Sequence, residues 1–174
     1  RVSGHEAARE ALLALVDRPG VKSALCWEHP VLDRVGLDAL LADRGVEKWS
    51  HPPLAERTAD EQRAHMLAAD LGITSATLAI AETGTLVMVA GAGSERTASL
   101  LPPVHVAIIE EQQIVPDLYD AFDRLAELEE MPSNVTLITG PSKTGDIELR
   151  LTTGVHGPGQ WHVIVIVDEA PAAT

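Results

Sequence analysis

Hydrophobic residues recur every three or four positions through residues 1–72, which is the spacing of an amphipathic helix. Helix-breaking residues close these segments: Pro19 and Gly20 follow the first, and Gly45 stands where a left-handed residue commonly ends a helix. We therefore predict a mainly helical N-terminal part. Its expected elements are helices over residues 5–16, 31–44 and 54–71 and a short strand over 46–49.

The pattern changes after residue 72, where continuous apolar runs alternate with segments of helical spacing. Such apolar runs are typical of parallel strands that are covered on both faces. The runs at 77–81 and 85–90 are separated by Glu82, Thr83 and Gly84, which indicates a turn and a hairpin-like insertion. The remaining expected elements are helices over 94–101, 115–129 and 144–149 and strands over 105–109, 135–139 and 163–167.

No segment between the two halves has the composition of a linker, and the sequence shows no internal repeat, so we predict one domain. The expected fold class is α/β, with an open, Rossmann-like and mostly parallel sheet that has helices on both faces. The domain would comprise the helical part over residues 1–72, a core over 73–168 and a tail over 169–174.

Composition and charge narrow the function classes. The chain carries 13 Lys and Arg against 26 Asp and Glu, a net charge of −13. Because nucleic acids and anionic membranes are bound through clustered basic residues, we expect neither as a partner. The apolar runs are far shorter than the roughly 20 residues of a membrane-spanning helix. The N-terminus also lacks a secretory signal pattern, so we expect a cytoplasmic protein.

The acids concentrate around the predicted helix over residues 115–129. Residues 110–130 hold eight acids and a single base, Arg124. Such a run is typical of a solvated helix face, and a docking surface for a basic partner is the alternative. The apolar face of this helix, which we expect to pack on the core, consists of Leu118, Phe122, Leu125 and Leu128. The chain could also form a homo-oligomer.

The single cysteine, Cys26, excludes an intrachain disulfide. It also excludes a four-cysteine zinc or iron–sulfur site built from this chain alone. We expect Cys26 to be a small buried residue. The sequence contains no His-x-His or His-x-x-x-His pair either, so we predict no metal site and no bound cofactor for this chain.

Two glycine-containing loops are candidates for anion binding. The first contains Gly91 and Gly93, but Arg96 replaces the third glycine of a dinucleotide-binding motif. Free backbone N–H groups at a helix start, with Arg96 and an N-capping Ser94 nearby, would still suit an anion. The second loop runs from 140 to 144 and is too short for a Walker A motif. Its Ser142 and Thr144 would contact a ligand or cap a helix.

Three further residues have a functional and a structural interpretation. Glu82 lies between two apolar segments, where a carboxylate is a ligand-binding or catalytic candidate or a turn residue that accepts backbone N–H groups. His156 lies in a Gly/Pro loop, where a neutral imidazole that satisfies backbone groups is the alternative to a site residue. His105, inside an apolar run, is expected to be a structural core residue.

Four segments in order resemble one protein family. They are Ala-Glu-Thr-Gly-Thr-Leu-Val at 81–87, Ser-Leu-Leu-Pro-Pro-Val-His at 99–105, Ile-Thr-Gly-Pro-Ser-Lys-Thr-Gly-Asp-Ile-Glu at 138–148 and Gly-Val-His-Gly-Pro at 154–158. On these motifs the chain resembles the lactate utilization protein C family, the LUD domain. The resemblance is specific over residues 73–167 and loose before them. Gly145 departs from the pattern, which has Ala there.

The resemblance implies a fold similar to the NagB/RpiA/CoA-transferase group and a role in bacterial oxidation of L-lactate to pyruvate. It also implies partner subunits that carry iron–sulfur clusters, while the catalytic residues stay unassigned. The candidate residues for a small-anion pocket are Glu82, Thr83, Gly84, Arg96, Gly140, Ser142, Thr144, Asp146 and His156. The alternative is a stand-alone enzyme acting on a sugar phosphate or an acyl-CoA, with Glu82 as nucleophile or base and the glycine-rich loops holding phosphate.

Overall fold

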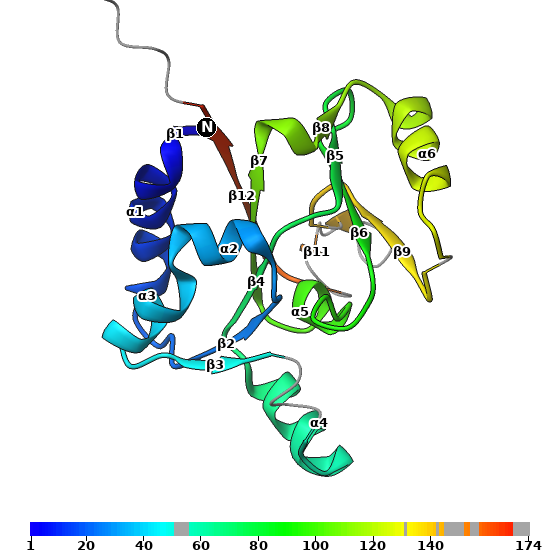
Figure 1. Cartoon of the computed structure of the whole chain (residues 1–174). Helices are drawn as coiled ribbons and strands as arrows, with labels where there is room; N and C mark the ends of the chain where they lie inside the picture. Colours follow the sequence, from blue (N-terminus) through cyan, green and yellow to red (C-terminus); the bar gives the residue numbers. More distant parts are fainter. Residues whose placement is uncertain (51–55, 131, 142, 145–151, 154–156, 169–174) are drawn as a thin grey trace, which may run out of the picture.

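The computed structural model (Figure 1) describes residues 1–50, 56–130, 132–141, 143–144, 152–153 and 157–168, of which 143–144 and 152–153 by backbone alone. The described residues form one sheet of six parallel strands, in the order β1-β12-β7-β4-β2-β3. The prediction of an open, mostly parallel α/β sheet is therefore confirmed. The strands are β1 (Val2–Ser3), β2 (Ser23–Cys26), β3 (Glu47–Trp49), β4 (Leu71–Thr74), β7 (Val104–Glu110) and β12 (Gln160–Val167).

Helices cover one face of this sheet, and a second sheet lies on the other face together with α5 (Figure 1). The helices on the first face are α1, α2 and α3, and their leucines pack on the strands in one core cluster. The helices are α1 (Gly4–Val16), α2 (Pro30–Val35), α3 (Leu37–Asp43), α4 (Ala59–Ala68), α5 (Thr97–Leu100) and α6 (Leu118–Ala126), with a 3₁₀ helix η1 (Glu111–Gln113). None of these described helices has the length and hydropathy needed to cross a bilayer.

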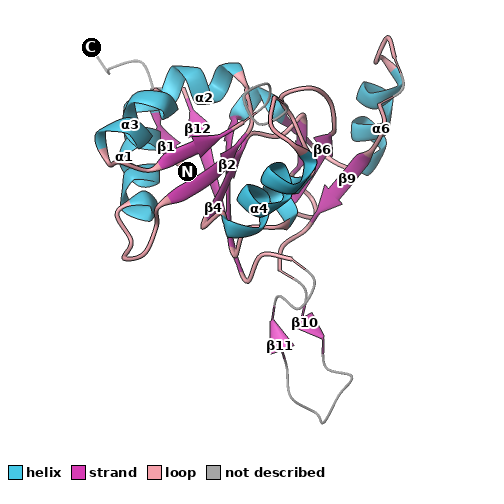
Figure 2. Ribbon diagram, turned by 90° about the horizontal axis from the view of Figure 1, so that it is seen from below, coloured by secondary structure: helices cyan, strands magenta, loops and turns pink. Residues whose placement is uncertain are grey.

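The second sheet contains the predicted hairpin. Within the described residues it has the order β8-β5-β6-β9, and β5 and β6 pair antiparallel on either side of the predicted turn. Its strands are β5 (Leu78–Ile80), β6 (Thr85–Val89), β8 (Ile114–Val115) and β9 (Val135–Ile138). A separate antiparallel pair, β10 (Lys143–Thr144) and β11 (Thr152–Thr153), stands apart from both sheets in Figure 2.

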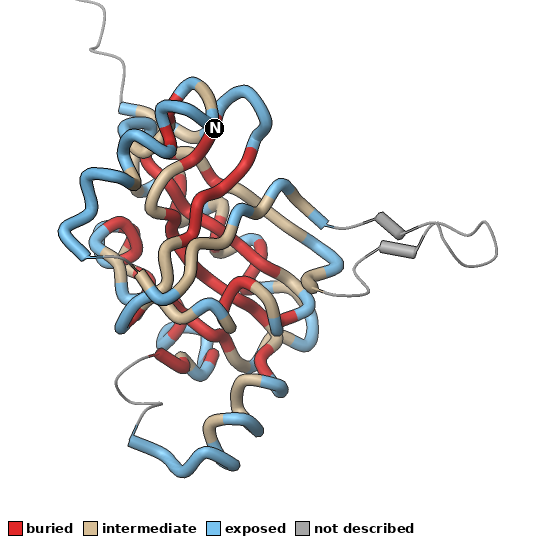
Figure 3. The backbone as a smooth tube through the Cα atoms, turned by 90° about the vertical axis from the view of Figure 1, so that its right-hand side faces the viewer, coloured by how far each residue is buried: buried red, intermediate tan, exposed pale blue. Residues whose placement is uncertain are grey.

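The core follows the parallel strands through the centre of the molecule (Figure 3). Strand β7 is buried over six of its seven residues, because its Val, Ala and Ile side chains are covered on both faces. Cys26 and His105 are buried, as expected from the sequence. Burial raises the pKa of the Cys26 thiol to about 12 and lowers the pKa of His105 to about 4. Thr74 Oγ1 lies 2.9 Å from His105 Nε2.

Several elements differ from the sequence prediction in the N-terminal part. The helix expected over 31–44 is divided at Gly36, whose φ of +72° ends α2; Arg9 Nη1 donates to the Gly36 carbonyl at 2.8 Å. The segment 54–71 contains the shorter α4 and then the start of β4. Residues 1–72 therefore supply strands to the main sheet as well as helices.

Other differences lie in the second half. Leu118 and Phe122 of α6 are exposed, and the shorter Ala121 is the residue of that helix buried against the second sheet. The helix expected over 94–101 is reduced to α5, and Ser94 Oγ donates to the Val89 carbonyl instead of capping it. Thr144, expected in a helix, lies in β10. The rest of that expected helix, from 145 to 149, lies outside the described residues.

One glycine fixes how closely α5 approaches the sheet. A Cβ on Gly72 of β4 would lie 1.8 Å from the Ala98 carbonyl oxygen of α5, well inside any tolerated contact. The chain can therefore bring α5 onto β4 only because residue 72 has no side chain.

Candidate functional site

The carboxyl ends of the parallel strands meet at one edge of the main sheet, which is where open α/β folds bind ligands. The strand order reverses between β2 and β4, because β2 leads to β3 on one side and β4 leads to β7 on the other. A ligand-binding site is therefore expected at this switch point or at the neighbouring ends of β7 and β12.

The chain covers the switch point with its own loop, residues 91–96. Trp27 Nε1 donates to the Glu95 carbonyl at 3.0 Å, and the Glu28 N–H donates to the Gly93 carbonyl at 2.7 Å. The Gly93 N–H, a predicted anion donor, is used by Glu95 Oε1 at 3.1 Å. The loop thus binds a carboxylate of its own chain, and Arg96 beside it is exposed.

Beyond the switch point, Gln113 links the ends of β4 and β7. Its Oε1 accepts the Glu110 N–H at 2.7 Å, and its Nε2 donates to the Ala76 carbonyl and to Ser75 Oγ. Both ends of this amide are therefore occupied. The result is that η1, which follows β7, is held against the segment that follows β4.

A charged cluster lies at the carboxyl end of β7. Glu110 Oε1 accepts hydrogen bonds from Arg34 Nε at 2.9 Å and Arg34 Nη2 at 2.6 Å, and lies 2.9 Å from His5 Nε2. The Glu110 side chain is only 10% exposed, against 46% for Arg34 and 38% for His5. Burial alone would raise the pKa of Glu110, but the hydrogen bonds from His5 and Arg34 outweigh it and hold that pKa below its usual value.

These three residues line a cavity of about 320 Å³, here called the Glu110 cavity. Gln112, in its wall, donates from Nε2 to Glu110 Oε2 at 3.0 Å. In the part of the chain that the structure describes, neither Arg34 Nη1 nor His5 Nδ1 has a hydrogen-bond partner. The full lining is His5, Arg34, Glu110, Gln112, Ile166 and Asp168.

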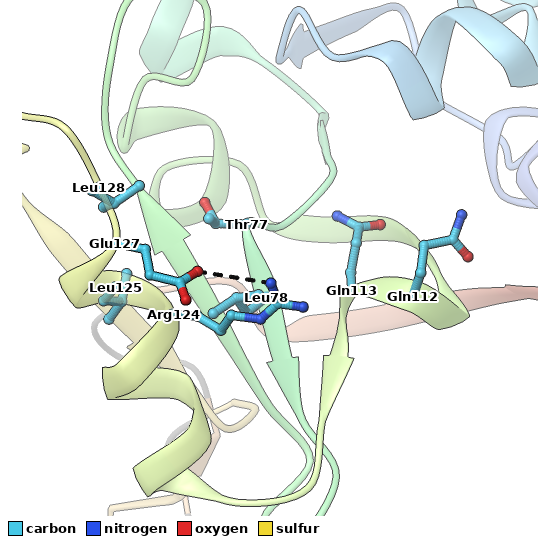
Figure 4. Close-up of a pocket in the computed structure, with 8 residues that line it drawn as sticks. All are labelled: Thr77, Leu78, Gln112, Gln113, Arg124, Leu125, Glu127 and Leu128. Atoms are coloured by element: carbon cyan, nitrogen blue, oxygen red, sulfur yellow. Dashed lines mark ion pairs between the residues drawn. The ribbon is translucent and has the colours of Figure 1, made fainter.

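A second cavity, of about 340 Å³, lies between η1, the second sheet and α6 (Figure 4). Arg124 extends from α6 across Leu78, and its guanidinium is 3.8 Å from Glu127. Gln112 lines this cavity as well as the Glu110 cavity, so the two share one wall. Leu78, Leu125 and Leu128 also line this second cavity, which makes it less polar than the Glu110 cavity.

The structure brings some of the predicted site residues together. A chain of hydroxyl contacts runs from Thr83 to Thr85 at 2.7 Å and from Thr85 to Thr139 at 2.9 Å. The turn with Glu82, Thr83 and Gly84 therefore lies beside Gly140 at one end of the second sheet. Arg96 lies elsewhere, on the loop over β2. Ser142, Asp146 and His156 lie outside the described residues, and Thr144 is described by its backbone alone.

The turn over residues 82–84 is exposed and lies beside an apolar cavity. Glu82 is exposed, so its carboxylate bears none of the burial cost that made it a functional candidate, and its N–H donates to the Pro116 carbonyl at 3.0 Å. The cavity next to Gly84, of about 220 Å³, is apolar and is walled by Trp161 and Val163 among others. Its described lining offers no charged side chain to an anion.

Sequence reasoning missed His5, Arg34 and Glu110, because they come from three segments that lie far apart in the chain. One local signal was available: Glu110 follows directly on an apolar run that forms a central parallel strand. An acid at the carboxyl end of a buried strand falls at the binding edge of an α/β sheet, where its desolvation cost requires a partner.

Comparison with known proteins agrees with the fold. The family model described as LUD domain matches residues 1–166. The chain is 35% identical over 163 residues to Lactate utilization protein C of Halalkalibacterium halodurans, covering 91% of this chain and 69% of that protein. It is 34% identical over 165 residues to Lactate utilization protein C of a Geobacillus species, covering 92% and 68%.

A solved structure shares the architecture. The crystal structure of a DUF162 family protein from Deinococcus radiodurans superposes with a TM-score of 0.65 at 21% identity, covering 94% of this chain and 85% of that one. At that identity the likeness concerns the fold alone. The match of the family model over nearly the whole chain, together with relatives above 30% identity, shows that the chain belongs to the LUD domain family.

Proposed function

We propose that this chain is a subunit of a bacterial L-lactate utilization system, which oxidises L-lactate to pyruvate together with iron–sulfur partner proteins. The observation that carries the proposal is the match, over more than nine-tenths of the chain, to relatives named Lactate utilization protein C. A small-anion site on this chain is the second part of the proposal.

The chemistry of lactate oxidation supports placing the electron-accepting clusters and the anion site on different chains. Oxidation of a 2-hydroxy acid to a 2-oxo acid releases two electrons and two protons, so an electron acceptor is required. The lone Cys26 is buried, its thiol pKa is raised to about 12, and a cubane cluster needs four thiolate ligands. We therefore assign the iron–sulfur clusters to partner chains and the binding of the small anion to this one.

Growth and co-purification test the proposal. In the organism that encodes the chain, deletion of its gene should abolish growth on L-lactate and leave growth on pyruvate unchanged, with rescue by the wild-type gene. The tagged chain, purified from cells grown on L-lactate, should bring down proteins that contain iron and acid-labile sulfide. Undiminished growth of the deletion strain on L-lactate would refute the proposal.

A thermal-shift screen of the purified chain addresses the alternative of a stand-alone enzyme. A ligand at 100 times its Kd stabilises a protein by about 2.7 kcal/mol, which is readily measured. Stabilisation by an acyl-CoA or a sugar phosphate, and none by lactate, would favour that alternative.

A further inference from the structure

We propose that the Glu110 cavity binds a small 2-hydroxycarboxylate. Its volume of about 320 Å³ lies at the lower end of the range of small-molecule sites, about 300–1,000 Å³. Its residues come from α1, α2, β7, η1, β12 and the residue after β12, and they converge on the carboxyl edge of the sheet. A polar cavity at this edge is the expected place for a ligand of an open α/β fold.

Arg34 supplies the group for the ligand carboxylate. Its Nε and Nη2 are both bound to Glu110 Oε1, which fixes the plane of the guanidinium and leaves Nη1 without a partner among the described residues. Because the side chain is already held, a carboxylate that binds to Nη1 does not have to order it. Glu110 thus acts as a positioning residue for Arg34.

His5 supplies the group for the ligand hydroxyl. His5 Nε2 lies 2.9 Å from Glu110 Oε1 and 3.3 Å from Arg34 Nε, which already donates to Glu110 at 2.9 Å. Because a carboxylate can only accept, the shorter contact places a proton on His5 Nε2. In the neutral imidazole, Nδ1 is then an acceptor, and it has no partner among the described residues. A hydroxyl next to the ligand carboxylate can donate to this nitrogen or to the carboxylate of Asp168, which also lines the cavity.

The balance of charge in the cavity explains why the hydroxyl matters. The lining holds one permanent cation, Arg34, and two carboxylates, Glu110 and Asp168. The lining is therefore net negative and repels a simple carboxylate. A ligand that also donates a hydrogen bond turns either Asp168 or His5 into a favourable contact, so the site selects hydroxycarboxylates over carboxylates that lack a donor.

The choice of L-lactate as the probe rests on the proposed function, whereas the site rests on the geometry alone. The test is an amide NMR titration of the full chain at pH 7 with sodium L-lactate and with sodium propionate, which has the same carbon skeleton without the hydroxyl. We expect L-lactate to bind at least about tenfold more tightly, as one hydrogen bond to a charged group allows. The largest shifts should be at His5, Glu110 and Gln112.

Variants then locate the site. Arg34→Gln should weaken L-lactate binding by about tenfold or more, since it removes a charge-assisted contact. Asp168→Asn should bring the affinities for propionate and L-lactate closer together, because it relieves the repulsion of a simple carboxylate. The matched control is Arg44→Gln, because Arg44 is also half-exposed and forms an ion pair, with Asp17 at 2.8 Å. This variant should bind L-lactate with the affinity of the wild type.

The inference is overturned by equal affinities of the wild type for L-lactate and propionate, or by wild-type affinity of a folded Arg34→Gln for L-lactate. If Arg34→Gln does not fold, Asp168→Asn decides, and an unchanged ratio of the two affinities refutes the site. Absence of L-lactate binding also refutes the site. It leaves the proposed function to be judged separately by growth and co-purification.

Discussion

Replacing Glu110 by glutamine tests whether the buried carboxylate holds α1 and α2 on the sheet. The substitution keeps the shape of the side chain and removes its charge. It weakens three contacts to Oε1, two from Arg34 and one from His5. Each hydrogen bond to a charged group contributes about 1.5–3 kcal/mol when both groups are buried.

The expected loss is smaller than that sum, because Arg34 and His5 are more than one-third exposed and water replaces part of what they lose. We expect Glu110→Gln to lower the free energy of unfolding at pH 7 by about 1–2 kcal/mol. Urea denaturation followed by tryptophan fluorescence measures it. The control is Glu111→Gln, since Glu111 is 52% exposed and paired to an exposed Arg1; its loss should stay within about 0.5 kcal/mol.

The pH dependence gives a second readout. The pKa of Glu110 is lowered in the folded chain, so its contribution is fully present above the unfolded pKa and is lost as the pH falls through the folded pKa. The stability difference between the wild type and Glu110→Gln should therefore shrink as the pH falls from 7 to below 4.5, the ordinary pKa of a glutamate. A difference that stays constant over this range, or one as small as that of Glu111→Gln at pH 7, would show that the carboxylate does not stabilise this corner of the fold.

Three further outcomes can be measured on the same protein. Gly72→Ala should destabilise by about 3 kcal/mol or more in urea titrations, because its Cβ would meet the Ala98 carbonyl at 1.8 Å, whereas Gly159→Ala, with open space around it, should change stability by under about 0.5 kcal/mol. Cys26 should resist alkylation at pH 8 in the folded chain and react in urea, because burial raises its thiol pKa to about 12; rapid labelling of the native protein would contradict its placement. His105 should titrate near pH 4 by NMR, because burial lowers its pKa to that value, and the stability it gives as a neutral side chain should be lost as the pH falls from about 6.5 toward 4; titration near pH 6.5 would place it in water.

Local signals in the sequence predicted the elements whose patterns are local. The hairpin of β5 and β6 followed from two apolar runs and a turn, and Gly84 has the positive φ of +64° that such a turn requires. Gly45, predicted to follow a helix, likewise has φ +64° directly after α3 and Arg44. In these cases the preference of a residue and its place in the fold agree.

Elements defined by distant partners were not predictable in this way. Strands β2 and β4 are only four residues long, too short for any hydrophobic period to be detected. What determines them is pairing across the sheet, aided by Asp70, whose Oδ2 accepts the N–H groups of Lys22 and Ser23 at 2.8 and 3.0 Å. The Glu110 cavity has the same character, because its residues are brought together only by the completed parallel sheet.

The pairing of β1 with β12 places the first and the last strand of the main sheet next to each other. Val2 is the register partner of Ile166, and Ser3 that of Val167, so the polypeptide enters and leaves the main sheet at one corner, beside His5 and Asp168. A tag or fusion partner attached before Arg1 would consequently begin next to the Glu110 cavity, and ligand titrations call for protein without it. The same proximity would allow a circular permutant in which a linker joins Asp168 to Arg1 and new ends open in an exposed turn far from this corner.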